Sequence, residues 1–178
     1  EVDRDQRSKA KVVNFGIAYG QGAFGLAQNL GIPRAEAKGI IDGYFAEFPG
    51  VKAYMDEMVA FGREHGYVRT LLGRRRYLPD LASGNNTVRA QAERVAINAP
   101  MQGTAADIIK IAMVRIHEKL RAEGLRSKLL LQVHDELVLD VKLDETDTVQ
   151  RLVKQAAMTL EVPLVVDMNV GKNWLEAH

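Results

Sequence analysis

The chain has 178 residues, 47% hydrophobic and 26% charged, which is the composition of an ordinary globular domain and not of a disordered or fibrous chain. Its formal net charge is only +1, so a surface for a polyanion has to be a local patch. The absence of cysteine excludes disulfides and thiolate metal sites. No apolar stretch is long enough to span a membrane, so we expect no membrane partner and a cytoplasmic location.

The N-terminal part of the chain is predicted to be helical. A first helix is expected from about Arg7 to Tyr19, and a glycine-rich joint follows at residues 20–25. The joint matches the pattern G-x-G-x-x-G, but a dinucleotide site needs a strand before these glycines, and here a helix precedes them. We therefore favour a simple joint. Glycine and proline signals then predict helices over residues 24–30, 33–47 and 49–65.

The first helix carries cations and aromatic rings at every fourth position: Arg7, Lys11, Phe15 and Tyr19. Steps of four on an α-helix drift by only about 40° each, so these side chains share one broad face. Such a face suits a nucleoside triphosphate, with the cations on its phosphates and the rings against its base and sugar. The alternative is a solvated face of an amphipathic helix.

A short basic hairpin is predicted next. Residues 67–72 and 76–78 have the pattern of paired strands around Gly73, with arginines at positions 74, 75 and 76 near the tip. These arginines either contact a phosphate backbone or remain solvated.

A long helix is predicted from about Asn86 to Glu123, with a kink or break at Pro100 because proline lacks the amide donor. Arg94, Asn98 and Gln102 step by four along it and form a polar stripe. Asparagine and glutamine can read acceptors in a DNA minor groove, and arginine adds a phosphate or sugar contact. Taken alone, the stripe is also compatible with a solvated helix face.

The apolar segment from Leu129 to Val141 is interrupted at its midpoint by His134, Asp135 and Glu136. Three ionisable residues cannot lie in a dry core, so they mark the turn of a β-hairpin. Adjacent acids at a turn offer the hard oxygen ligands that Mg²⁺ uses on phosphate substrates. The alternative is a solvated hairpin end, because aspartate is common in turns.

Two of these motifs, in this order, resemble family A DNA polymerases of the bacterial DNA polymerase I type. Arg7, Lys11, Phe15 and Tyr19 followed by glycine resemble the nucleotide-binding helix of the fingers. The segment 132–136 resembles the carboxylate motif of the palm. The similarity covers essentially the whole chain, including residues 77–80, 92–94, 97–107 and 173–174.

The resemblance implies an α+β fold with two parts. Residues 1–80 would form a helical fingers subdomain, and residues 81–178 would form the C-terminal part of a palm with the minor-groove helix and the carboxylate hairpin. The palm would be a small antiparallel sheet covered by helices, completed by a helix over residues 144–160 and a strand over residues 164–169. Family members carry another metal-binding aspartate upstream of the fingers helix, and no such stretch occurs in this sequence. The chain is therefore expected to be a C-terminal fragment, acting as a monomer within a longer chain.

The implied activity is template-directed DNA synthesis in replication and repair. Primer-template DNA and deoxynucleoside triphosphates would be the partners, and Mg²⁺ would bind at a two-metal site that is incomplete in this chain. By the resemblance, Asp135 would bind metal, with Glu136 as a neighbouring catalytic carboxylate and His134 facing the primer end. Arg7 and Lys11 would hold the triphosphate, and Lys11 would also protonate the leaving pyrophosphate.

The remaining site residues would position the nucleotide and the duplex. Phe15 would pack on the incoming nucleotide, and Tyr19 would occupy the place of the templating base until the fingers close. Arg94, Asn98 and Gln102 would lie along the minor groove near the primer terminus.

Two other classes of function stay open. One is a catalytically inert fragment that binds nucleotide and DNA, because the upstream aspartate motif is absent. The other is a metal-dependent phosphohydrolase built on the His-Asp-Glu hairpin. The latter would need further ligands nearby, and the remaining histidines, His65, His117 and His178, show no such spacing.

Overall fold

The computed structural model describes residues 3–158 and 160–177. The chain folds as two compact units, Glu1–Thr104 and Ala105–His178. The boundary between them lies inside one long helix. The division into fingers and palm at residues 80 and 81 is a functional one and stays a prediction. No helix within the described ranges is long and apolar enough to cross a membrane.

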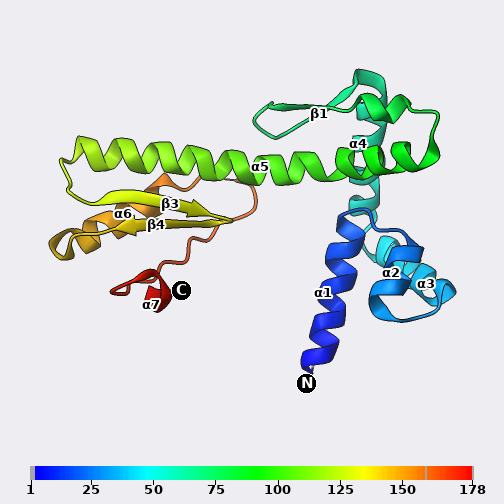
Figure 1. Ribbon diagram of the computed structural model, residues 1–178, viewed down its shortest axis with the longest axis horizontal. Helices are drawn as coiled ribbons and strands as arrows, with labels where there is room; N and C mark the ends of the chain where they lie inside the picture. The colour runs from blue at the N-terminus through cyan, green and yellow to red at the C-terminus, as the bar shows by residue number, and fades with distance from the viewer. Residues whose placement is uncertain (1–2, 159, 178) are drawn as a thin grey trace. The chain divides into compact units, whose positions relative to one another are not determined.

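Helices and a short antiparallel hairpin make up the first unit (Figure 1). Asp3 and Gln6 form a reciprocal capping box at the start of the first helix, which therefore begins one turn earlier than predicted. The elements are α1 (Arg4–Ala18), α2 (Ala23–Leu30), α3 (Arg34–Glu47), α4 (Pro49–His65), β1 (Tyr67–Arg69), β2 (Arg75–Tyr77), the 3-10 helix η1 (Pro79–Ala82) and the first part of α5 (Asn86–Ala122).

Two apolar clusters hold this unit together. In the first, α2 and α3 contribute Leu26, Ala27 and Ala37, and Val12 and Val13 of α1 pack against them. The second joins the hairpin and η1 to α5 and contains Val68, Leu78, Leu81, Ala92 and Ala96. One face of α1 therefore packs in the core, and the other face is exposed to solvent.

A kink or a break was expected at Pro100, and a break is wrong because α5 continues through this residue. A proline removes one amide donor, but the hydrogen bonds on both sides of it can maintain the helix. The Thr104 hydroxyl donates to the Pro100 carbonyl at 2.6 Å and stabilises the turn that follows. The helix consequently contributes residues to both units.

The second unit is a β-hairpin packed on two helices, which confirms the expected α+β class with a small antiparallel sheet covered by helices (Figure 1). Leu137 and Leu139 of the hairpin pack against Ile116 of α5 and Leu152 of the following helix. The elements are the second part of α5, β3 (Lys128–Val133), β4 (Glu136–Asp140), the 3-10 helix η2 (Leu143–Glu145), α6 (Thr146–Ala156) and α7 (Trp174–Ala177).

The predicted strand over residues 164–169 is wrong. In the described part of the chain, β3 and β4 pair only with each other, and residues 164–169 have no strand partner. A strand requires a ladder of hydrogen bonds to a sheet edge, and Val165, 77% exposed, is not packed as a sheet residue would be. Helix α6 also ends at Ala156, earlier than the predicted end at residue 160.

A carboxylate clamp joins the two feet of the β3–β4 hairpin. Glu145 accepts hydrogen bonds from the Ser127 hydroxyl at 2.6 Å and from the Ser127 and Arg126 amides at 2.9 and 3.0 Å. The Ser127 hydroxyl in turn accepts a bond from the Lys142 amide at 3.0 Å. The Ser127 hydroxyl bond is the main cause that lowers the pKa of Glu145 from 4.5 to about 2, followed by the bond from the Arg126 amide.

The clamp predicts an acid-dependent contribution to stability. Because the pKa of Glu145 is depressed in the folded chain, its stabilisation is fully present above pH 4.5 and is lost as the pH falls towards 2. Chemical denaturation should show a lower free energy of unfolding for Glu145→Gln than for the wild type at neutral pH. This difference in free energy should become smaller as the pH falls from 4.5 to 2. Asp147→Asn, which removes an exposed acid from the first turn of the following helix α6, is the control. An equal difference at all pH values would contradict the clamp.

Candidate functional site

Helix α1 presents the predicted row of cations and rings to solvent. Arg7, Lys11, Phe15 and Tyr19 are all exposed, whereas Ile17 on the opposite face is only 1% exposed. The Phe15 and Tyr19 rings stack with their centroids 6.1 Å apart and their planes 18° apart. The four side chains therefore share one face, as the spacing predicts. Along this face, the two cations are followed by a flat apolar surface formed by the two stacked rings.

The C-terminus of α1 is attached to the polar stripe of α5. The Asn98 amide Nδ2 donates to the Tyr19 carbonyl at 3.2 Å. Gly20 follows with φ +79°, and a Cβ at this position would lie 3.4 Å from Arg94 Cγ and 3.4 Å from Ile97 Cδ1. A glycine is favoured here because the backbone is left-handed and the space beside it is filled. The end of α1 thus contacts the stripe directly.

The stripe itself is accessible at both ends. Arg94 and Gln102 are exposed, and Arg94 Nη2 donates to Gln91 Oε1 at 2.6 Å. Asn98 Oδ1 is buried and accepts no hydrogen bond among the described residues, so it has an unused acceptor. These groups offer donors and acceptors of the kind that minor-groove readers use.

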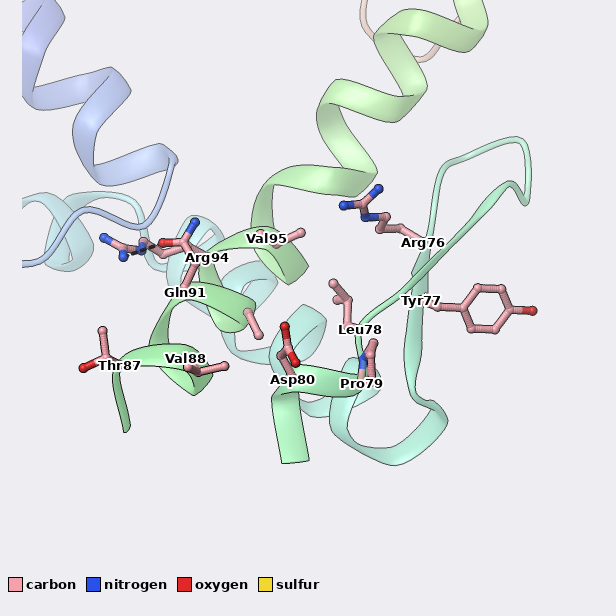
Figure 2. A pocket seen from close by; sticks show the side chains of 11 residues that line it. Arg76, Tyr77, Leu78, Pro79, Asp80, Thr87, Val88, Gln91, Arg94 and Val95 are labelled. Atoms are coloured by element: carbon pink, nitrogen blue, oxygen red, sulfur yellow. Dashed lines mark hydrogen bonds between the residues drawn. The ribbon is translucent and has the colours of Figure 1, made fainter. Parts of the chain in front are cut away.

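A cavity of about 440 Å³ lies beside the stripe. Figure 2 shows α5 residues Gln91 and Arg94 on one side of it and Arg76 and Tyr77 of β2 on the other. In the sequence, Arg76 is recognisable only as part of a basic tip. Its place across the cavity from Arg94 depends on the docking of the hairpin, which no local pattern predicts.

The carboxylate motif forms the turn of the β3–β4 hairpin. Val133 pairs with Glu136, so His134 and Asp135 make a two-residue loop, and Glu136 is the first residue of β4. His134 has φ +54°, and its carbonyl accepts a bond from Gln132 Nε2 at 2.5 Å. The left-handed conformation of a non-glycine residue is a local strain that the surrounding pairing has to maintain. Asp135 is exposed at the tip, as predicted, and the neighbouring acid lies in the strand.

Trp174 contacts the second carboxylate of the motif and is not among the predicted site residues. Its indole Nε1 donates to Glu136 Oε2 at 3.3 Å, although 38 positions separate the two residues. The tryptophan begins α7, whose first turn is stabilised by hydrogen bonds between Asn173 and Glu176. In the sequence, Trp174 is marked only by being the sole tryptophan and by lying in the segment 173–174 of the family resemblance, and neither signal predicts its contact with Glu136.

The site residues form two groups. In the first unit, α1 and the stripe meet at Tyr19 and Asn98. In the second, Asp135, Glu136 and Trp174 gather around the hairpin turn. Across the described ranges, no cluster of three or more histidine, cysteine, aspartate or glutamate side chains could hold a metal. The turn itself offers two adjacent carboxylates, which are hard oxygen donors, and a metal role for them stays a prediction.

The Trp174 contact predicts a fluorescence change. Glu136→Ala removes the acceptor of the indole N–H, so the emission of Trp174 should change as its ring is released into water. Because this is the only tryptophan in the sequence, emission spectra report on it alone. Asp140→Ala removes another acid of the same strand and should leave the spectrum unchanged. Identical spectra for the wild type and Glu136→Ala would contradict the contact.

Comparisons with known proteins agree over nearly the whole chain. The family described as DNA polymerase family A matches residues 1–176. DNA polymerase I of Pseudomonas aeruginosa is 54% identical over 181 residues, which cover 100% of this chain and 20% of that protein. DNA polymerase I of Chloroflexus aurantiacus is also 54% identical, over 98% of this chain and 19% of its own length. The chain thus spans about one fifth of these relatives.

A solved structure supports the same assignment. The POL domain of Pol1 from M. smegmatis, in complex with DNA primer-template and dNTP, has a TM-score of 0.95 and 47% identity, covering 99% of this chain and 32% of that one. The match of motifs, sequence and fold over almost every residue leads to one conclusion: the chain belongs to DNA polymerase family A.

Proposed function

We propose that this chain carries the nucleotide-binding face and part of the catalytic surface for template-directed DNA synthesis. The observation that carries the proposal is the exposed row of two cations and two stacked rings on α1, whose end is bonded to the polar stripe of α5. The homologous POL domain from M. smegmatis, which was solved with primer-template and dNTP, supports it. The reaction joins the primer 3′-oxygen to the α-phosphate of a deoxynucleoside triphosphate and releases pyrophosphate.

In this proposal, Arg7 and Lys11 bind the triphosphate. Both side chains are exposed on the same face of α1, one turn apart. A guanidinium offers a planar fork of donors to phosphate oxygens, and an ammonium offers a compact charge that can also donate a proton. Lys11 protonates the leaving pyrophosphate and offsets the negative charge that develops during transfer.

The rings on the same face position the nucleotide. Phe15 packs on the sugar and base of the incoming nucleotide, and Tyr19 occupies the place of the templating base before closure. Gly20 serves as the hinge, because its left-handed backbone directly follows the helix and touches α5. When α1 moves about this hinge, the hydrogen bond from Asn98 to the Tyr19 carbonyl is one of the contacts that changes.

Arg94, Asn98 and Gln102 contact the minor groove near the primer terminus, and His134 faces the primer end. Minor-groove acceptors are common to all correct base pairs, so contacts of this kind test geometry without selecting a sequence.

Asp135 is the proposed metal ligand, with Glu136 as a neighbouring carboxylate. Side chains of successive strand residues point to opposite faces, and Glu136 already accepts a bond from Trp174, so Asp135 is the freer of the two. Mg²⁺ bound at this turn would supply Lewis-acid stabilisation of the phosphoryl oxygens. A monomeric state within a longer chain and a cytoplasmic location remain predictions.

A duplex titration tests the DNA-binding part of the proposal. Binding of a fluorescent primer-template should fall with salt, and Arg94→Ala should weaken it and lower the slope of log affinity against log salt by about 1. Arg121→Ala, which removes an exposed arginine from the end of α5, should leave binding unchanged. Circular dichroism verifies that each variant is folded. Equal binding by the wild type and Arg94→Ala would contradict the assignment of the stripe.

A second candidate is a catalytically inert fragment that binds nucleotide and DNA. It is favoured by the incomplete ligand set, since the family's other metal-binding aspartate lies on a strand that this sequence does not contain. We expect the 178-residue chain alone not to extend a primer in a gel assay with Mg²⁺. Extension that is abolished by Asp135→Ala and retained by Asp140→Ala would overturn this candidate and assign catalysis to the chain itself.

A further inference from the structure

The β1–β2 hairpin has an outward face that the proposed polymerase site does not use. Tyr67 pairs with Tyr77 and Arg69 pairs with Arg75, so these side chains share one face of the hairpin. Val68 between them is 0% exposed and packs in the core with residues of α5. The face with two tyrosines and two arginines is consequently the one directed away from that core.

The two arginines of this face are direct cross-strand partners, and like charges in that position repel each other. Neither forms an ion pair with a carboxylate within the described ranges. The segment from Gly66 to Pro79 contains four arginines and no acidic residue. The pair therefore concentrates positive charge without a counter-charge of its own.

Aromatic rings hold both guanidiniums in place. Arg75 Cζ lies 4.6 Å from the centroid of the Tyr67 ring, and Arg69 Cζ lies 5.6 Å from that of Phe61. Tyr67 also makes an edge contact with Tyr77, at 5.8 Å between centroids. Stacking uses the flat face of a guanidinium and leaves its in-plane N–H groups free for an oxyanion such as phosphate.

Tyr77 adds a stacking surface beside the charged pair. The residue is 66% exposed, so most of its ring is accessible to a ligand. Figure 2 shows this ring directed away from Arg94 and Gln91, hence away from the stripe of α5. Exposed rings next to fixed arginines are the combination with which proteins bind single-stranded nucleic acid.

The hairpin is anchored firmly enough to keep this geometry. The Arg74 guanidinium Nη2 donates to the Gly103 carbonyl at 2.9 Å, and the Leu71 amide donates to the Thr104 hydroxyl at 3.0 Å. A Cβ at Gly103 would lie only 2.6 Å from Thr70 Cγ2, so the close approach of the hairpin to α5 requires glycine. A preorganised surface loses less entropy when it binds a ligand.

From these observations we propose that the outward face of the β1–β2 hairpin is a binding site for single-stranded DNA. Arg69 and Arg75 together hold one backbone phosphate, and Tyr77 stacks an adjacent unpaired base. The site is separate from the stripe formed by Arg94, Asn98 and Gln102. It does not depend on the proposed polymerase activity, because a single strand is bound here without a duplex on the stripe.

Fluorescence anisotropy with a labelled oligothymidylate tests the phosphate contact. The double variant Arg69→Gln/Arg75→Gln should bind more weakly and should lower the slope of log affinity against log salt by about 0.7, the value for one single-strand phosphate. The charge-matched control Arg34→Gln/Arg121→Gln removes two exposed arginines elsewhere and should bind like the wild type. Unchanged binding by the first double variant, or equal weakening by the control, would overturn the proposal.

Three single variants of the folded chain test the stacking contact and the separation of the sites. Tyr77→Ala should weaken oligothymidylate binding by about fivefold or more, and Tyr77→Phe, which keeps the ring, should restore it. Arg94→Ala should weaken binding of the duplex primer-template and leave oligothymidylate binding unchanged. If Arg94→Ala weakened both equally, the single strand would lie on the stripe and the proposal would be wrong, whereas the polymerase proposal would still be judged by the duplex result alone.

Discussion

The periodicity of α5 is the constraint on which most of the structure depends. Ala92 and Ala96 enter the core beneath the β1–β2 hairpin, and Ile116 and Leu120 enter the core beneath the β3–β4 hairpin. A single helix thus supplies apolar residues to both compact units, and burying them stabilises each unit in turn. The same periodicity leaves the polar stripe outside the apolar clusters, where it is available to a ligand.

Helix α1 shows how one element combines packing and binding. Its apolar residues fix it against α2 and α3, so the row of cations and rings on the other face is held on a rigid scaffold. Tyr19, at the C-terminal end of α1, accepts a hydrogen bond from Asn98 of the stripe. A movement of α1 would therefore change a hydrogen bond made by a residue of the stripe. In the function proposed above, this hydrogen bond connects the helix that binds the nucleotide with the stripe that binds the duplex.

Charges are balanced in one hairpin and unbalanced in the other. At the foot of the β3–β4 hairpin, Glu145 accepts bonds from Ser127 and Arg126, which lower its pKa and fasten the two strands together. On the β1–β2 hairpin, Arg69 and Arg75 face each other without a carboxylate in the described ranges and are held only by rings. The first arrangement serves stability. The second has the features of a surface that is completed by an anion.

The sequence alone determined the features that arise from local rules. Helical spacing placed the α1 face and the α5 stripe correctly, glycine and proline located most helix ends, and ionisable residues in an apolar run located the turn at Asp135. The resemblance to a known family supplied the fold class. Only the tertiary structure decided whether residues 164–169 formed a strand, how Glu145 is clamped and where Trp174 meets Glu136. Each of these depends on a partner far along the chain, and spacing in sequence carries no information about such contacts.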